Sequence, residues 1–157
     1  MVSRIVVMMV SLTAAFAGPL QTIEMTGPAS RSQILAASPE WEAVMAAYQP
    51  RPEAVETLRR IGQPVLMEVY FGSWCSDSKA HVPALFKILE MADNPLLQVS
   101  YAAIPRDKAA RARFIPEGRD VDKLPTFIVF LNSKEIGRII ETPARSMEED
   151  LAALLRR

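Results

Sequence analysis

The segment Val65–Phe71 is the sequence feature that most restricts the fold. Its residues are nearly all apolar, with many branched and aromatic side chains, and Glu68 is the only charged one. Such a run is typical of a strand that is buried in a sheet on both faces. Gly72 and Ser73 then mark a turn, and the apolar residues that follow recur at helical spacing. The sequence therefore predicts a core strand that passes directly into a helix.

The other predicted elements complete an α/β fold. Two short helices precede the strand, one beginning at Ser38 and Pro39 and the other running from Pro52 to Gly62. A strand at Leu96–Ile104 and a short helix around Asp107–Phe114 follow. The last elements are a hairpin of strands at Thr126–Leu131 and Glu135–Ile140 and a final helix with a capping box at Ser146 and Glu149. This order predicts a mixed central sheet with helices on both faces.

The composition indicates one globular domain and excludes several classes of partner. Half of the 157 residues are apolar and 23% are charged, which is sufficient for one substantial core. Because 18 basic residues balance 18 acidic ones, nothing in the charge indicates binding to nucleic acid. The eight methionines lack the spacing of metal ligands, and one histidine with one cysteine cannot form a structural zinc site.

The first 17 residues have the pattern of a secretory signal peptide. Arg4 precedes the apolar run Ile5–Phe16, which ends in the small residues of a cleavage site. The run is shorter than the roughly 20 residues of a spanning helix. We therefore expect cleavage near Gly18, export to the periplasm or the outside of the cell, and no membrane span in the mature chain.

The mature chain is expected to have two parts. A polar leader, Gly18 to about Ala29, and a helical extension together occupy residues 18–51, and the main domain occupies residues 52–157.

In an oxidising compartment the only cysteine, Cys75, is a free reactive thiol, an intermolecular bridge or a buried inert residue. It is predicted to lie at the N-terminus of the helix after the core strand, where unpaired N–H groups and the helix dipole favour a thiolate.

The chain resembles the thioredoxin superfamily from about Pro52 to Arg157. Trp74 and Cys75 match the tryptophan and the attacking cysteine of the family motif, and Pro83 matches its helix-kinking proline. Leu124-Pro125-Thr126 resembles the cis-proline loop that lies against the active-site cysteine and pairs with a substrate peptide. The resemblance implies a thioredoxin-like fold, and the substrate-binding residues that it implies are Trp74, Leu124, Pro125 and Thr126.

Two positions depart from the family pattern. Ser78 stands where the family has its second, resolving cysteine, so this chain cannot release a mixed disulfide by forming an internal one. The family's buried acid has no match, because Val69 falls at its position and Glu68 is predicted to point to the opposite face. A single cysteine can still attack a disulfide, a glutathione adduct or a sulfenic acid, and a second thiol from solution must then free it.

These observations lead to one main hypothesis with two alternatives. We expect an exported thiol-disulfide oxidoreductase of redox homeostasis in which Cys75 attacks and Ser78 steadies the thiolate by a hydrogen bond, with no bound cofactor or metal. Its partners would be an oxidised or disulfide-bearing protein or a low-molecular-weight thiol. One alternative is a non-catalytic peptide-binding or chaperone-like module that uses the same groove. The other is a homodimer bridged through Cys75.

For two further features we favour an interpretation that gives them no functional role. His81, the only histidine, is predicted to lie well around the helix from Cys75 and to be exposed to solvent. The basic segment from Arg106 to Arg119 is predicted to be a solvated surface, with a site for an acidic partner or a glutathione carboxylate as the second interpretation.

Overall fold

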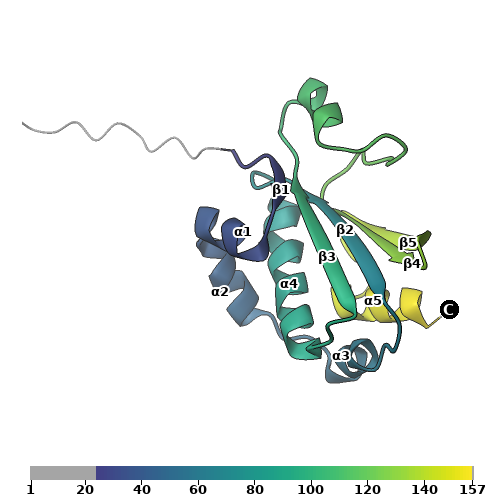
Figure 1. Ribbon diagram of the computed structural model, residues 1–157. Helices are drawn as coiled ribbons and strands as arrows, with labels where there is room; N and C mark the ends of the chain where they lie inside the picture. Colours follow the sequence, from purple (N-terminus) through teal and green to yellow (C-terminus); the bar gives the residue numbers. More distant parts are fainter. Residues whose placement is uncertain (1–23, 157) are drawn as a thin grey trace, which may run out of the picture.

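The structure, a computed structural model, describes residues 24–156. The predicted signal peptide and its cleavage point lie outside the described residues. In chain order the elements are β1 (Gly27–Ala29), α1 (Arg31–Ala37), α2 (Glu40–Ala47), α3 (Pro52–Arg59), β2 (Val65–Phe71), α4 (Ser76–Ala92), β3 (Leu97–Ala103), the 3-10 helix η1 (Lys108–Arg113), β4 (Thr126–Leu131), β5 (Lys134–Ile140) and α5 (Met147–Leu155) (Figure 1). Within residues 24–156, no helix is both long enough and apolar enough to cross a bilayer.

The strands form one mixed sheet with β2 at its centre. The strand order is β1-β3-β2-β4-β5, and only the β2–β3 pair is parallel. Val69 of β2 lies opposite Tyr101 of β3 on one side and Phe127 of β4 on the other. Residues 65–70 of β2 therefore have a partner on each side. The apolar sequence predicted burial on both faces, but Leu66 is 41% exposed, so this holds only at the carboxyl end of the strand.

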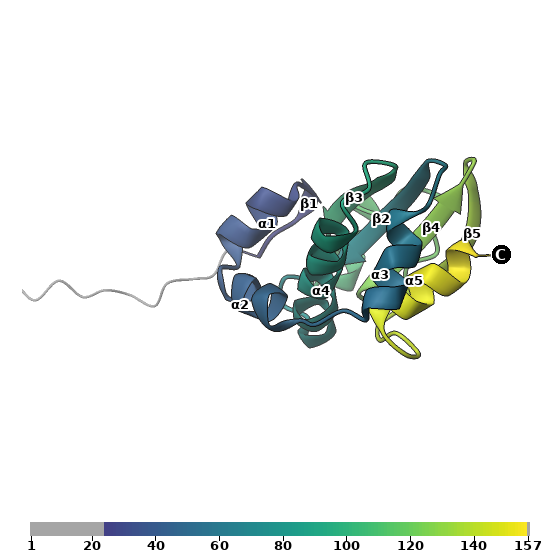
Figure 2. The ribbon, with the colours of Figure 1, turned by 90° about the horizontal axis from the view of Figure 1, so that it is seen from below.

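Alternate residues of β2 point into two different apolar clusters. Val65, Met67 and Val69 face the larger cluster, which α3, α4 and α5 cover by packing beside one another on one face of the sheet (Figure 2). Tyr70 faces a smaller cluster on the opposite side, against the segment that contains η1. The prediction of a mixed sheet with helices on both faces is confirmed, although a short 3-10 helix is the helix of the second face.

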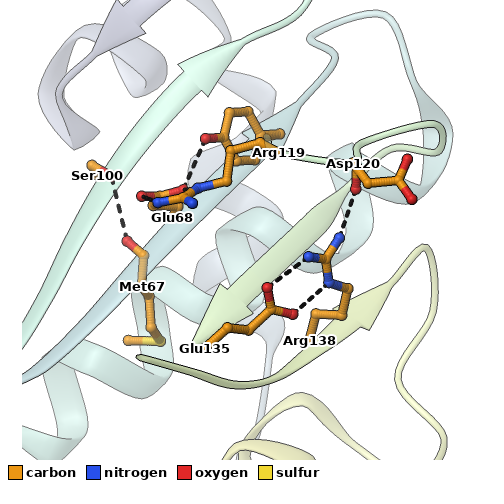
Figure 3. Close-up of polar contacts among 8 residues, drawn as sticks. Met67, Glu68, Ser100, Arg119, Asp120, Glu135 and Arg138 are labelled. Carbon is orange, nitrogen blue, oxygen red and sulfur yellow. Dashed lines mark hydrogen bonds and ion pairs between the residues drawn. The ribbon is translucent and has the colours of Figure 1, made fainter. Parts of the chain in front are cut away.

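The rest of the second face is open and carries ion pairs. Arg119 donates two hydrogen bonds to Glu68, at 2.7 and 2.9 Å, and Arg138 pairs in the same way with Glu135 (Figure 3). The Arg119 guanidinium holds the pKa of Glu68 below its ordinary value, despite partial burial. Glu68 therefore lies on the face opposite Val69, as predicted, and serves there as a surface partner of arginine.

The N-terminal segment is part of the same fold, and the end of the predicted polar leader forms a strand that the sequence analysis did not predict. Strand β1 pairs with β3, with Gly27 opposite Ala103, and α1 follows it with a capping box at Ser30. Helix α2 begins one residue later than predicted, with Pro39 at its N-cap. Its Trp41 is fully buried against Phe71, at 5.8 Å between ring centroids. The extension therefore packs against the domain, as expected.

A buried carboxylate joins this extension to the last helix. Glu148, in the first turn of α5, is 1% exposed. It accepts a hydrogen bond from the Tyr48 hydroxyl at 2.7 Å and one from the Arg51 backbone N–H at 3.0 Å. Burial alone would raise the pKa of Glu148, but the donors around the carboxylate hold its pKa below the ordinary value. The charged form of Glu148 is therefore the one that stabilises the fold.

We expect Tyr48→Phe to lower the free energy of unfolding by about 1.5 kcal/mol at neutral pH, because the variant loses a hydrogen bond to a charged acceptor. The stability that Glu148 contributes is fully present above the unfolded carboxyl pKa of about 4.3 and declines as the pH falls toward the lower folded value. Urea unfolding at pH 7 and pH 4 should therefore show a smaller acid-induced loss for Tyr48→Phe than for the natural chain.

Tyr101→Phe is the matched control for this experiment. The Tyr101 ring packs edge-on against Phe86, and its hydroxyl has no hydrogen-bond partner among residues 24–156. This variant should leave the difference between the two pH values unchanged. An equal effect of both variants would contradict the role given to Glu148.

Candidate functional site

Cys75 lies where the central strand turns into the long helix α4. It is the N-cap of α4, with an extended backbone, and its thiol is partly exposed. Its N–H donates to the Gly72 carbonyl at 3.0 Å, and its carbonyl accepts from the Lys79 N–H at 3.0 Å. The turn that Gly72 begins therefore places Cys75 at the N-terminus of α4, where the sequence predicted it, although its side chain makes no capping hydrogen bond to the first turn.

The loop before β4 approaches the thiol from the other side. The Cys75 Sγ donates to the Leu124 carbonyl at 3.3 Å, and the Leu124–Pro125 peptide bond is cis. The Thr126 hydroxyl donates to the Lys123 carbonyl, and the Glu141 N–H donates to the Pro125 carbonyl, both at 2.7 Å. The structure thus brings the predicted cysteine and the predicted proline loop together, although they are about 50 residues apart in sequence.

The side chains of this loop face inward. Leu124 is 6% exposed and Thr126 is 1% exposed, and Pro125 is also buried. The carbonyls of Leu124 and Pro125 are also already hydrogen-bonded, to the Cys75 thiol and to the Glu141 N–H. Contact of these three residues with a substrate therefore stays a prediction. Trp74 is the residue of the predicted substrate-binding set whose side chain reaches the surface.

Ser78 holds the turn instead of the thiol. Its side chain is fully buried, and its Oγ accepts a hydrogen bond from the Gly72 N–H at 3.1 Å. In the part of the chain that the structure describes, no hydrogen bond joins Ser78 to Cys75, which differs from the expected contact. Ser78 is thus a positioning residue, because it ties the end of β2 to the first turn of α4.

The Trp74 indole is fixed against the turn that precedes Cys75. Its Nε1–H donates to the Ile104 carbonyl at 3.0 Å. A Cβ atom added to Gly72 would lie 2.8 Å from the ring, so the indole packs directly against the glycine backbone. The guanidinium carbons of Arg106 and Arg111 lie over the ring, at 5.1 and 5.6 Å from its centroid.

This arginine pair was missing from the predicted site. The sequence showed only a local concentration of basic residues between Arg106 and Arg119, for which a solvated surface was the favoured interpretation. Arg119 instead pairs with Glu68, and Arg106 and Arg111 reach back more than 30 residues to Trp74. The only early signal was the interpretation of this segment as a site for an acidic partner.

His81 is half-buried, whereas the sequence predicted an exposed side chain. Burial lowers its pKa, and the charge of Asp77, one helical turn earlier, acts in the opposite direction. Among the described residues it makes no hydrogen bond with Cys75. The expectation that His81 does not serve the thiol as a base stays a prediction.

Comparisons with known proteins point to one family. A family model described as thioredoxin matches residues 32–153, which is most of the chain. A protein of unknown function from Pseudomonas aeruginosa is 19% identical over 82% of this chain and 88% of its own, with a TM-score of 0.50. An HIV epitope scaffold is 17% identical over 83% of each chain, with a TM-score of 0.54. At these identities the two structures show a shared fold alone, and no curated protein matches the sequence.

We expect Gly72→Ala to displace the Trp74 ring and to destabilise the fold by about 1–3 kcal/mol, because the added methyl group has no room beside the indole. Iodide quenching of tryptophan fluorescence should increase, since Trp74 is the more exposed of the two tryptophans and Trp41 stays buried. Gly62→Ala is the control, because a Cβ there meets nothing within 4 Å. Equal quenching of the two variants would contradict the described packing of Trp74.

Proposed function

The chain belongs to the thioredoxin family, and from this we propose that it exchanges thiols and disulfides through one cysteine, Cys75. One observation carries the proposal: the partly exposed thiol stands at the N-cap of α4 and lies 3.3 Å from the carbonyl of the residue before cis-Pro125. An inert structural cysteine would be buried, away from the backbone dipoles of a helix terminus.

The proposed reaction transfers one half of a disulfide to the protein. The Cys75 thiol gives its proton to solvent, and its sulfur attacks one sulfur of the substrate disulfide. The substrate S–S bond breaks as the new one forms, and the departing thiolate takes a proton from solvent. Cys75 is thereby oxidised to a mixed disulfide, and half of the substrate is reduced. A second thiol from solution then attacks the mixed disulfide. Cys75 returns to its thiol form, and the attacking thiol leaves in a new disulfide with the bound half of the substrate.

The surrounding groups support this step in different ways. Cys75 stands at the N-cap of α4, and the Ser78–Gly72 hydrogen bond keeps the first turn of that helix in place. The Leu124 carbonyl holds the neutral thiol, so this contact is lost once the proton leaves. A substrate chain would lie beside Trp74 and along the backbone of the cis-proline loop. Neither a cofactor nor a metal takes part in the proposed step.

The exchange proposal predicts a persistent mixed disulfide. After incubation with 2-hydroxyethyl disulfide at pH 7.5, intact-mass spectrometry should show one added half-disulfide on the native protein. Because the chain has no second cysteine to expel it, the adduct should remain until a second thiol is added. Cys75→Ser should form no adduct while keeping its circular dichroism spectrum.

Other outcomes distinguish the alternatives. If Cys75 reacts only after denaturation, the exchange proposal is wrong. If Cys75→Ser still binds the same extended peptide, the chain is a binding module that does not need the thiol. If the untreated protein runs as a covalent dimer that Cys75→Ser abolishes, the cysteine serves as an intermolecular bridge.

Export is the second part of the proposal. The signal-peptide pattern of residues 1–17 supports it. When the full chain is expressed in a bacterium, we expect a periplasmic product whose mass corresponds to a start near Gly18. Val7→Arg interrupts the apolar run and should keep the chain unprocessed in the cytoplasm. An unprocessed natural chain in the same fraction as Val7→Arg would overturn the export proposal.

A further inference from the structure

We propose that Arg106 and Arg111 make the Cys75 site selective for disulfides that carry carboxylates. This inference rests on the proposed exchange activity and names the class of substrate that the site prefers. The arginine pair over Trp74, the place of Trp74 next to Cys75, and the hydrogen-bond partners of Arg111 carry the argument.

Trp74 places two positive charges close to the reacting sulfur. The guanidinium carbons of Arg106 and Arg111 lie 5.1 and 5.6 Å from its ring centroid. Trp74 precedes Cys75 in the chain, and both residues pack against the same small apolar cluster. Both charges therefore lie over the residue next to Cys75, and at physiological ionic strength a charge acts over a Debye length of about 8 Å.

Neutral groups hold Arg111 in this position. Its Nε donates to the Pro105 carbonyl at 3.2 Å, and its Nη1 donates to the Asp122 carbonyl at 3.3 Å. Carbonyl partners orient a guanidinium without cancelling its charge. The arrangement leaves a full positive charge on a side chain that is already fixed, so an anion that binds there meets an ordered partner.

The nearby carboxylates bind backbone groups instead. Glu24 accepts from the Arg106 N–H at 2.6 Å, and Asp107 accepts from the Ala109 N–H at 3.0 Å. Within residues 24–156, neither Arg106 nor Arg111 forms an ion pair, whereas Arg119 is paired with Glu68. The two guanidinium groups over Trp74 are thus available to a carboxylate from outside.

A groove beside Trp74 limits how far this charge extends. It is lined by Glu24 and Glu40 as well as by Lys79 and Arg106, so its charges balance. Arg111 does not line this groove, and its positive charge adds to those of the groove. A preferred substrate would therefore have its S–S bond at Cys75 and its carboxylate directed toward the arginines over Trp74. The same charges also attract the thiolate that leaves when the disulfide is attacked.

The test compares three aliphatic disulfides that differ in charge: oxidised glutathione is anionic, 2-hydroxyethyl disulfide is neutral and cystamine is cationic. Rates of Cys75 modification are measured by mass spectrometry for the natural chain, for Arg106→Gln/Arg111→Gln and for Arg113→Gln. Each disulfide is its own reference across the variants, so differences in leaving-group chemistry cancel. Arg113→Gln removes one exposed positive charge from the same segment.

The double variant should react more slowly with oxidised glutathione, on the order of fivefold at low salt, and faster with cystamine. Its rate with 2-hydroxyethyl disulfide should stay within about twofold of the natural rate, and Arg113→Gln should change every rate less than the double variant does. Added salt should shrink the difference. Equal changes for all three disulfides would overturn the selectivity and leave the exchange activity standing. No reaction of the natural chain with any of them would overturn both.

Discussion

Strand β2 is paired on both sides and buried on both faces at its carboxyl end, and the site depends on this constraint. Tyr70 and Phe71 are 4% and 0% exposed. The chain therefore leaves the sheet at a fixed point, and the Gly72–Ser78 hydrogen bond ties that point to the first turn of α4. Since Tyr70 lies opposite Thr126, the same strand also fixes where β4 begins. The cysteine and the cis-proline loop meet because each is attached to an end of a strand that cannot shift.

The sequence predicted those parts of the fold that local patterns determine. The bounds of β2 and β4 follow from apolar runs between turns, and the structure reproduces them. Strand β1 has no such signal, because Gly-Pro-Ala carries no strand pattern and pairs only because β3 offers a free edge. Its existence depends on a partner about 75 residues later in the chain.

The same distinction applies to the site. The position of Cys75 was predictable, because it depends on a turn within a few residues. The partner of Ser78 was not, since Cys75 has an extended backbone and the two residues are not a helical i, i+3 pair. The contacts of Arg106 and Arg111 with Trp74 depend on where an irregular segment returns to the sheet. No periodicity in the sequence encodes that return.

The hydrogen bond between Tyr48 and Glu148 connects residues that are 100 positions apart. Closing so long a loop costs little more entropy than closing one half as long, but it requires that both segments already exist. During synthesis the N-terminal extension is made about 100 residues before α5, so Tyr48 finds its acceptor only after α5 has been made. A chain that ends before Glu148 leaves the extension without this anchor, so truncation at one end of the protein becomes a folding defect at the other.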